Sequence, residues 1–224
     1  MSHWLKIELL SDACFSGGVG FAGEVDLDVE QEEALGLPCI RGRTLKGVIV
    51  EECAWILKSL QGINFSGSWE QSAKRLFGTS GDSEHETLKI GNALLPEPFR
   101  EAVKQDIQSS TLTARNMLHS LTDIRHQTKI DRNTKAHEPH SLRSTRLALT
   151  GLSFYSHLSG GTRLGEEEKA LFAASVLSFR RGGLHRNRGW GKLRARILDS
   201  GYQDVTAQWV EPLLNLYQRR RISD

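Results

Sequence analysis

The chain has 224 residues, enough for one sizeable hydrophobic core or for two small domains side by side. A hydrophobic content of 38% and a charged content of 25% are typical of globular proteins and exclude the disordered and fibrous classes. The formal net charge is only +2, so total charge alone indicates no class of partner.

The first residues, MSHWLKIELLSDA, contain no basic stretch followed by a long apolar run. No stretch of the sequence approaches the ~20 apolar residues of a membrane helix, so we expect a soluble cytoplasmic protein without a membrane partner. The cysteines Cys14, Cys39 and Cys53 are widely spaced and form no C-x-x-C pair. This spacing predicts buried reduced thiols, with neither a disulfide framework nor a zinc site.

Charge is distributed unevenly along the chain. Segment 24–33 is strongly acidic, whereas segment 180–196 contains arginines and lysines with no acidic residue between them. Separated blocks of opposite sign favour a local basic surface that binds an anion. A solvated charged face is the alternative interpretation.

In chain order, the first half predicts two strands and two helices. Alternation over 4–10 is typical of a half-buried strand, and a glycine-rich loop follows it. Apolar residues recur at helical spacing over 44–60, where Thr44 is placed to cap the N-terminus. Residues 69–77 predict a short helix and residues 87–95 a strand.

The second half is interrupted by a long polar stretch. Residues 112–141 are basic and rich in histidine without a lasting period, which predicts a helix fragment followed by a long exposed loop. The other predicted elements are a helix at 98–107, a strand at 147–157, a helix at 166–179, a strand at 190–198 and a helix at 205–219.

This order of strands and helices predicts an α+β fold. We expect a ferredoxin-like (RRM-like) core, with an antiparallel sheet, helices on one of its faces and the long polar stretch as a protruding loop. No proline-rich linker and no internal repeat divides the sequence, so we expect one domain over 1–224, with a basic insertion at about 113–146.

Three stretches together resemble one known family. Residues 36–47, GLPCIRGRTLKG, are similar to a G-x-P-x-I-P-G-S-S-L-K-G signature, and residues 182–193, GGLHRNRGWGKL, to a C-terminal glycine-rich loop. The third is RLFG at 75–78, followed by the strand LKIGNA at 88–93. The chain therefore resembles the RAMP (repeat-associated mysterious protein) superfamily, especially the backbone subunits of type III CRISPR effector complexes. It departs from the signature at Arg41, where proline is common, and at Arg43-Thr44, which replace two serines.

Each stretch has a physical reason to bind RNA. The free N–H groups at a helix start, beside Gly42, Arg43, Thr44 and Lys46, form an anion site suited to a phosphate. The second loop offers the same combination. Its candidate RNA-binding residues are Gly182, Gly183, Arg186, Arg188, Gly189 and Trp190, with Trp190 either stacking on a base or packing. An ordinary hairpin is the alternative for this loop.

The polar insertion carries a further resemblance. Residues 128–136, TKIDRNTKA, are similar to the I-D-R-x-T-x-x-A segment at the thumb of backbone subunits. The resemblance implies that Lys129, Arg132 and Lys135 contact the duplex of guide and target. An exposed basic loop without a fixed partner is the alternative. His137 and His140 lack further ligands at usable spacing, so we expect no zinc site.

The resemblance also implies a cutting residue. The G-x-I-D of family members that cleave target RNA falls on Gly23-Glu24-Val25-Asp26, which makes Asp26 the candidate and Asp28 its alternative. Asp26 would hold Mg²⁺ or another divalent cation, or orient a ribose 2′-hydroxyl for in-line attack. Catalytic members often carry histidine before the first glycine pair, where this chain has Cys14-Phe15-Ser16.

The resemblance implies an antiviral ribonucleoprotein role, with guide RNA, complementary target RNA and other CRISPR effector subunits as partners. We expect a guide-binding backbone subunit with metal-dependent endonuclease (hydrolase) activity on the target. The sequence leaves that activity open, because a capping or structural subunit would bind RNA without cutting it and need no cofactor. A metal-independent endonuclease that processes repeat RNA through a histidine is less favoured, and an unrelated α+β RNA-binding module is a further alternative.

Overall fold

The computed structural model describes residues 3–18, 20, 24–61, 68–78, 88–128, 130, 141–160 and 164–221. Its centre is a four-stranded antiparallel sheet in the order β4-β7-β1-β8. These strands are β1 (His3–Leu9), β4 (Lys89–Leu94), β7 (Ser153–Ser159) and β8 (Leu193–Leu198). Counted along the chain they lie in the order 2-3-1-4, the ferredoxin-like arrangement expected from the sequence.

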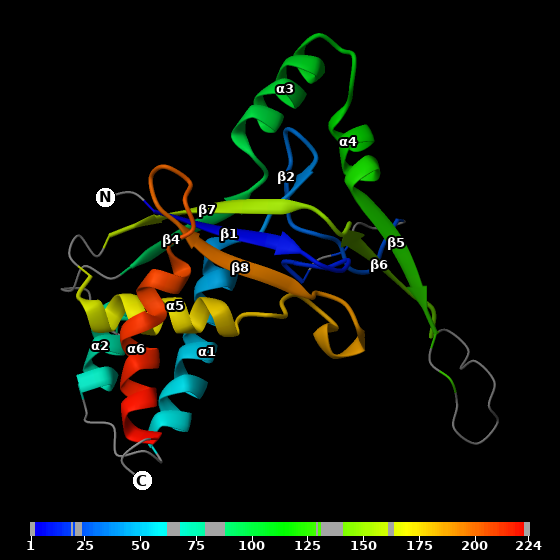
Figure 1. Ribbon diagram of the computed structural model, residues 1–224. Coiled ribbons are helices and arrows are strands. Elements are labelled where there is room, and N and C mark those ends of the chain that lie inside the picture. The colour runs from blue at the N-terminus through cyan, green and yellow to red at the C-terminus, as the bar shows by residue number, and fades with distance from the viewer. Residues whose placement is uncertain are drawn as a thin grey trace.

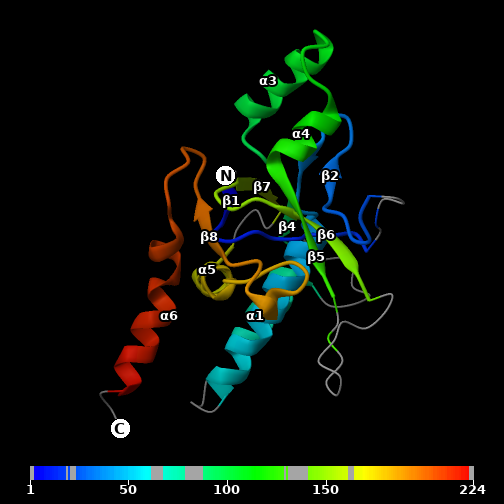
Figure 2. The ribbon, with the colours of Figure 1, turned by 90° about the vertical axis from the view of Figure 1, so that its right-hand side faces the viewer.

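Four helices cover one face of this sheet, below it in Figure 1. They are α1 (Gly42–Gln61), α2 (Ser68–Phe77), α5 (Glu166–Ser178) and α6 (Thr206–Arg221). On the opposite side stand α3 (Glu97–Gln108) and α4 (Ala114–Leu121), as Figures 1 and 2 both show. Within the described residues, no helix has the length and apolarity needed to cross a membrane.

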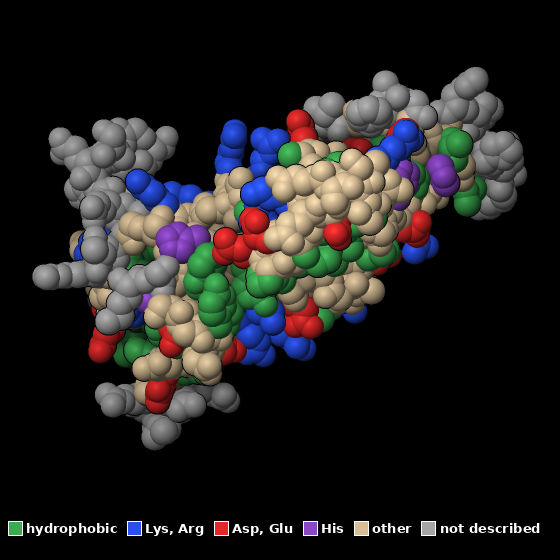
Figure 3. Space-filling model, turned by 90° about the horizontal axis from the view of Figure 1, so that it is seen from above, with side chains coloured by type: hydrophobic (Ala, Val, Ile, Leu, Met, Phe, Trp, Pro, Cys, Tyr) green, Lys and Arg blue, Asp and Glu red, His purple; other side chains and the backbone are tan. Residues whose placement is uncertain are grey.

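Strand β1 is one of the two inner strands, and its alternation explains which face is buried. Leu5, Ile7 and Leu9 are almost fully buried on the helical side, as period-two spacing requires. On the other face Trp4 stacks on Tyr202, with ring centroids 5.8 Å apart. Figure 3 looks onto that side of the molecule, where hydrophobic side chains reach the surface between charged groups of both signs.

Helix α1 begins two residues earlier than the sequence predicted. Gly42 is its first residue, and its N–H donates to Asn92 Oδ1 at 2.9 Å, so a side chain from β4 caps the helix. The prediction that Thr44 caps the helix is therefore wrong. A side chain at Gly42 would place Cβ 2.2 Å from the Ile90 carbonyl oxygen, so only glycine allows this close approach of α1 to β4.

Helix α5 is the centre of the helical layer. Leu171, Phe172 and Val176 are fully buried, and the helix contacts α1, α2 and α6. A helix that is buried on most sides loses the one-sided polarity of a surface helix, and α5 is accordingly apolar beyond its acidic first turn.

Two predictions for the middle of the chain are wrong. After α4 the backbone enters β5 (Thr122–Gln127), which pairs antiparallel with β6 (Arg143–Ala148), so the first part of the predicted loop is a strand. The single strand predicted at 147–157 is two strands, because β6 ends at Ala148 and a turn at Gly151, with φ +86°, precedes β7. The two strands are each apolar because each packs into a core, and the sequence does not show that the two cores are different.

The second core is small. Cys14, Val29, Leu118 and Leu147 form a buried cluster against which Trp190 packs, separate from the main core. The short pair β2 (Gln31–Glu32) and β3 (Leu37–Pro38) was not predicted, and η1 (Arg186–Arg188) is a single 3₁₀ turn. The other predicted helices and strands form close to their expected ranges, and all three cysteines are buried and free.

Candidate nucleic-acid interface

The acidic segment around Asp26 runs along the outer side of β6. Leu27 forms a parallel bridge with Thr145. The N–H groups of Asp26 and Leu27 donate to the Ser144 carbonyl at 3.1 and 3.2 Å, and the Arg146 N–H donates to the Leu27 carbonyl at 2.9 Å. Residues 25–27 therefore lie along β6, joined to it by these backbone hydrogen bonds and by one isolated bridge.

Asp26 lies exposed on this segment. Its Oδ2 accepts hydrogen bonds from the Ser144 N–H at 2.6 Å and from Ser144 Oγ at 3.0 Å. These bonds lower the pKa of Asp26 from its ordinary value, because they stabilise the charged carboxylate. No described residue donates a further side-chain hydrogen bond to Oδ1. Asp26 is thus an oriented, ionised carboxylate open to a ligand.

Asp28, the alternative candidate, has a different environment. Its Oδ1 accepts from the Val29 N–H at 2.8 Å and from Arg146 Nε at 3.1 Å. The Arg146 side chain is only 1% exposed, and its Nη2 also binds Glu24 Oε2 at 3.0 Å. Arg115, on α4, binds the other oxygen of Glu24. Asp28 is therefore an ion-pair partner of a buried arginine, whereas Asp26 pairs with no arginine in the part of the chain that the structure describes.

The described residues do not offer a complete metal centre. They contain no cluster of three or more His, Cys, Asp or Glu side chains able to hold an ion. Mg²⁺ is commonly bound by one or two carboxylates together with water and phosphate oxygens. A cation at Asp26 would therefore take most of its ligands from RNA and solvent. His137 and His140 lie outside the described residues.

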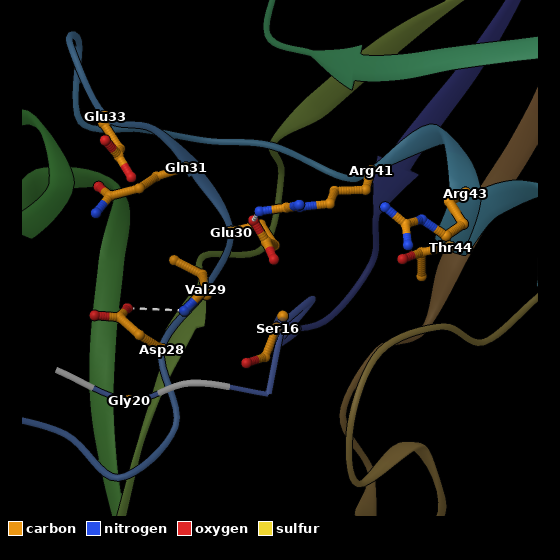
Figure 4. A pocket seen from close by; sticks show the side chains of 11 residues that line it. Ser16, Gly20, Asp28, Val29, Glu30, Gln31, Glu33, Arg41, Arg43 and Thr44 are labelled. Carbon is orange, nitrogen blue, oxygen red and sulfur yellow. Dashed lines mark hydrogen bonds and ion pairs between the residues drawn. The ribbon is translucent and has the colours of Figure 1, made fainter.

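A cavity of about 500 Å³ lies beside this segment, at the start of α1 (Figure 4). Its lining includes Asp28 and Glu33 on the acidic side and Arg41, Arg43 and Thr44 on the helical side. Arg41 Nη2 pairs with Glu30 Oε2 at 2.7 Å. The cavity is therefore polar and carries charges of both signs.

The predicted anion site at the helix start is only partly accessible. Gly42 is buried and its N–H is already bonded to Asn92, so this residue serves packing. Arg43 and Thr44 are exposed and line the cavity, and Lys46 is half-buried. Among the described residues Arg43 pairs with no carboxylate, which leaves its guanidinium available for a phosphate.

The glycines of loop 182–191 also differ in role, because some allow close packing and one has open space around it. A Cβ at Gly182 would lie 2.9 Å from the Phe15 ring, and Gly183, with φ +83°, would place its Cβ 2.6 Å from the Cys14 carbonyl oxygen. Both glycines therefore allow the loop to pack on segment 14–15. Gly189 has φ +92° with open space around it, so its role is conformational.

The loop's side chains are also divided between packing and access. Trp190 packs against the second core and meets the His185 ring edge-on, with centroids 5.6 Å apart, so it is a packing residue. Arg188 is exposed, with Nη1 3.4 Å from Gln127 Oε1 on β5. Arg186 is partly exposed, with Nη2 3.7 Å from Glu51 Oε1 on α1. The loop therefore places two arginines between α1 and the hairpin.

The remaining predicted contacts, Lys129, Arg132 and Lys135, lie outside the described residues. The sequence interpretation missed Ser144, Arg146 and Arg115, which organise the acidic segment. Alternating polar residues on a strand are the only sequence signal for Ser144 and Arg146, and this pattern does not identify their partners.

Comparison with known proteins agrees with the fold. Residues 6–194 match the RAMP superfamily. No curated protein sequence matches the chain. A chain of the apo type III-B Cmr-beta cryo-EM structure is 14% identical, with a TM-score of 0.62 over 89% of this chain and 98% of that one.

A chain of the type III-B Cmr-beta cryo-EM structure bound to cognate target RNA gives a similar result. It is 15% identical, with a TM-score of 0.61 over 88% of this chain and 97% of the other. At these identities the likeness is one of fold. Because the family match extends over most of the sequence, the chain belongs to the RAMP superfamily.

Proposed function

We propose that this chain is a guide-RNA-binding backbone subunit of a type III CRISPR effector complex. The observation that carries the proposal is the position of the glycine-rich loop, which brings Arg186 close to α1 and Arg188 close to β5. The glycine-rich loop thereby lies between helix α1, which begins with one predicted contact, and strand β5, which precedes the predicted thumb segment. Family membership and the shared fold with chains of a Cmr-beta complex support the same proposal.

The binding chemistry follows from the accessible side chains. Arg43, Arg186 and Arg188 contact phosphates as planar, always-charged donors, and base pairing with the guide selects the target. Contacts of this kind release counterions from the RNA, so affinity falls as salt rises.

The binding proposal is tested by measuring guide RNA affinity at several salt concentrations. The triple variant Arg43→Ala, Arg186→Ala, Arg188→Ala should bind more weakly and show a shallower salt slope than the native chain. Arg194→Ala is the matched control, because Arg194 is an exposed arginine on β8 that pairs with Glu8. A dissociation constant independent of salt, or equal weakening in the control, contradicts the proposal.

We further propose that Asp26 takes part in cutting the paired target RNA. In-line attack forms a bond between the ribose 2′-oxygen and phosphorus and breaks the bond from phosphorus to the 5′-oxygen. The 2′-hydroxyl gives its proton to water, and the departing 5′-oxygen takes a proton from water. The ionised Asp26 carboxylate orients the hydroxyl, and a divalent cation bound there would neutralise charge on the phosphate.

The cutting proposal is tested with the assembled complex and a guide-complementary RNA in Mg²⁺. Asp26→Asn keeps the shape of the side chain and removes its charge, so one specific cut should be lost while assembly is unchanged. Asp123→Asn, a change at an exposed carboxylate on β5 of the same hairpin, should leave the cut intact. Unchanged cutting by Asp26→Asn would make the chain a non-cutting scaffold and leave the binding proposal standing.

A further inference from the structure

We propose that Ser144 and Arg146 are positioning residues for Asp26, and that they join Asp26 to the β5–β6 hairpin as one rigid unit. The inference rests on the proposed cutting role of Asp26. Its consequence is that the carboxylate follows any movement of the hairpin, because its segment is hydrogen-bonded to β6.

The backbone provides the first link. Segment 25–27 is bonded to β6 through the Ser144 carbonyl, the Arg146 N–H and the parallel bridge between Leu27 and Thr145. From the other side, Gly20 comes so close that a Cβ there would lie 2.2 Å from the Asp26 carbonyl oxygen. The segment is therefore enclosed between β6 and Gly20, with little room to shift alone.

Side-chain spacing provides the second link. Ser144 and Arg146 are two residues apart on β6, so they lie on one face of that strand. Ser144 donates its backbone N–H and its hydroxyl to Asp26. Arg146 binds the carboxylates on either side of Asp26, those of Glu24 at 3.0 Å and Asp28 at 3.1 Å. One arginine therefore fixes both ends of the segment that has Asp26 at its centre.

The buried Arg146 neutralises the two carboxylates that flank Asp26. Arg146 is 1% exposed, while the side chains of Glu24 and Asp28 are 27% and 14% exposed. A buried cation needs paired anions, and these two carboxylates supply them. Their charges are thereby neutralised, and Arg115 further compensates Glu24. Asp26 is exposed and forms no ion pair within 4.0 Å among the described residues, so its charge is accessible to a ribose hydroxyl or a cation.

The hairpin also carries basic side chains toward RNA. Arg143, at the start of β6, directly precedes Ser144, and Arg188 contacts Gln127 on β5. RNA that binds these groups therefore sets the position of the strand that holds Asp26. Displacing a reacting group by about 1 Å can reduce a rate by roughly a hundredfold, so this connection is a sensitive way to align the carboxylate.

The inference is tested with two pairs of variants in the assembled complex. Arg146→Met removes the cation at similar volume, and Arg146→Lys restores the charge without the two-sided fork. Ser144→Ala removes the hydroxyl, and Ser144→Thr keeps it. Three quantities are measured: the single-turnover cutting rate with its pH profile, guide RNA affinity, and hydrogen exchange at the Asp26 and Leu27 amides.

Arg146→Met should slow cutting by about tenfold to a hundredfold and speed exchange at both amides, with guide affinity unchanged. Arg146→Lys should recover part of both losses. Ser144→Ala should move the acidic limb of the pH profile upward, because Asp26 loses a bond that favours its ionised form, and Ser144→Thr should not. A purely structural role for Ser144 would not move that limb.

The two proposals can fail separately. If Asp26→Asn abolishes the cut but all four variants cut as fast as the native chain, the positioning inference is overturned and the cutting proposal stands. If Asp26→Asn is without effect, the cutting proposal fails. Exchange still tests the rigid unit in that case, and unchanged protection at Asp26 and Leu27 in Arg146→Met would refute it.

Discussion

The two cores of this protein are held together by different forces. The main core lies between the four-stranded sheet and α1 and α5, and buries residues such as Phe154 and Phe172. The hairpin unit, which we define as α4, β5, β6 and residues 24–29, has a small cluster of apolar side chains and a buried arginine with two carboxylates. Apolar burial is non-directional, whereas the ion pairs need particular partners in particular places. The main core should therefore tolerate a change of one apolar residue for another, whereas the hairpin unit depends on the identity of each charged residue.

The largest expected effect is a cavity in the main core. Phe172→Ala should lower the free energy of unfolding by about 3–5 kcal/mol, because it removes a fully buried ring from α5. Urea denaturation followed by circular dichroism measures it. Phe99→Ala on α3 is the control, since Phe99 is partly exposed and should cost far less.

A smaller loss is expected in the hairpin unit. Arg146→Met should cost about 1–3 kcal/mol, because Glu24 and Asp28 lose their cation but retain some access to water. The same urea titration measures the loss, and a double-mutant cycle with Asp28→Asn gives the coupling between the two side chains. A coupling near zero would mean that shape, and not charge, holds the acidic segment against β6.

The contact between the sheet and α1 predicts a still smaller effect. Asn92→Ala should cost about 1 kcal/mol, because the Gly42 N–H loses its cap and is left without a partner inside the protein. Thermal unfolding measures the change. Gln105→Ala, at an exposed position on α3, serves as the control and should be close to neutral.

The smallest expected effect is a difference in local opening between the two cores, which is measured by the reactivity of one buried cysteine in each. Burial and the nearby Asp28 raise the pKa of Cys14 to about 12, so its folded-state thiol stays protonated and unreactive well above pH 8. Cys53 is equally buried but lies in the main core. At pH 8 we expect iodoacetamide to modify Cys14 before Cys53, as mass spectrometry of peptides would show. Equal rates would mean that the hairpin unit opens only with the whole protein.

Sequence reasoning succeeded where one local pattern decided the structure. The alternation in β1 and the helical spacing in α1 each point to a single core, so their positions were predicted closely. The prediction of one strand over 147–157 failed because Leu147 belongs to the second core and Phe154 to the main core. No pattern in one segment indicates which of two cores will bury it.

The candidate site was predicted only in outline. The family signature made Asp26 a candidate, but it indicated neither Ser144, which binds Asp26, nor Arg146, which binds Asp28, each 118 residues further along the chain than the carboxylate it contacts. The glycines of the candidate site were also open to two interpretations, close approach of RNA or close packing within the protein. Gly42, Gly182 and Gly183 do permit close approach, but to the protein's own backbone and rings. A sequence reveals the need for space without revealing what occupies it.

The pairing of β1 has a consequence for the time course of synthesis. Trp4 pairs with His157 on one side and with Leu198 on the other, so the strand emerges first and waits for partners made much later. At translation rates of roughly 5–20 residues per second, that wait is on the order of 10–40 s. During this interval Leu5, Ile7 and Leu9 have no sheet to join. The nascent chain therefore depends on being kept from aggregation until the final strand leaves the ribosome.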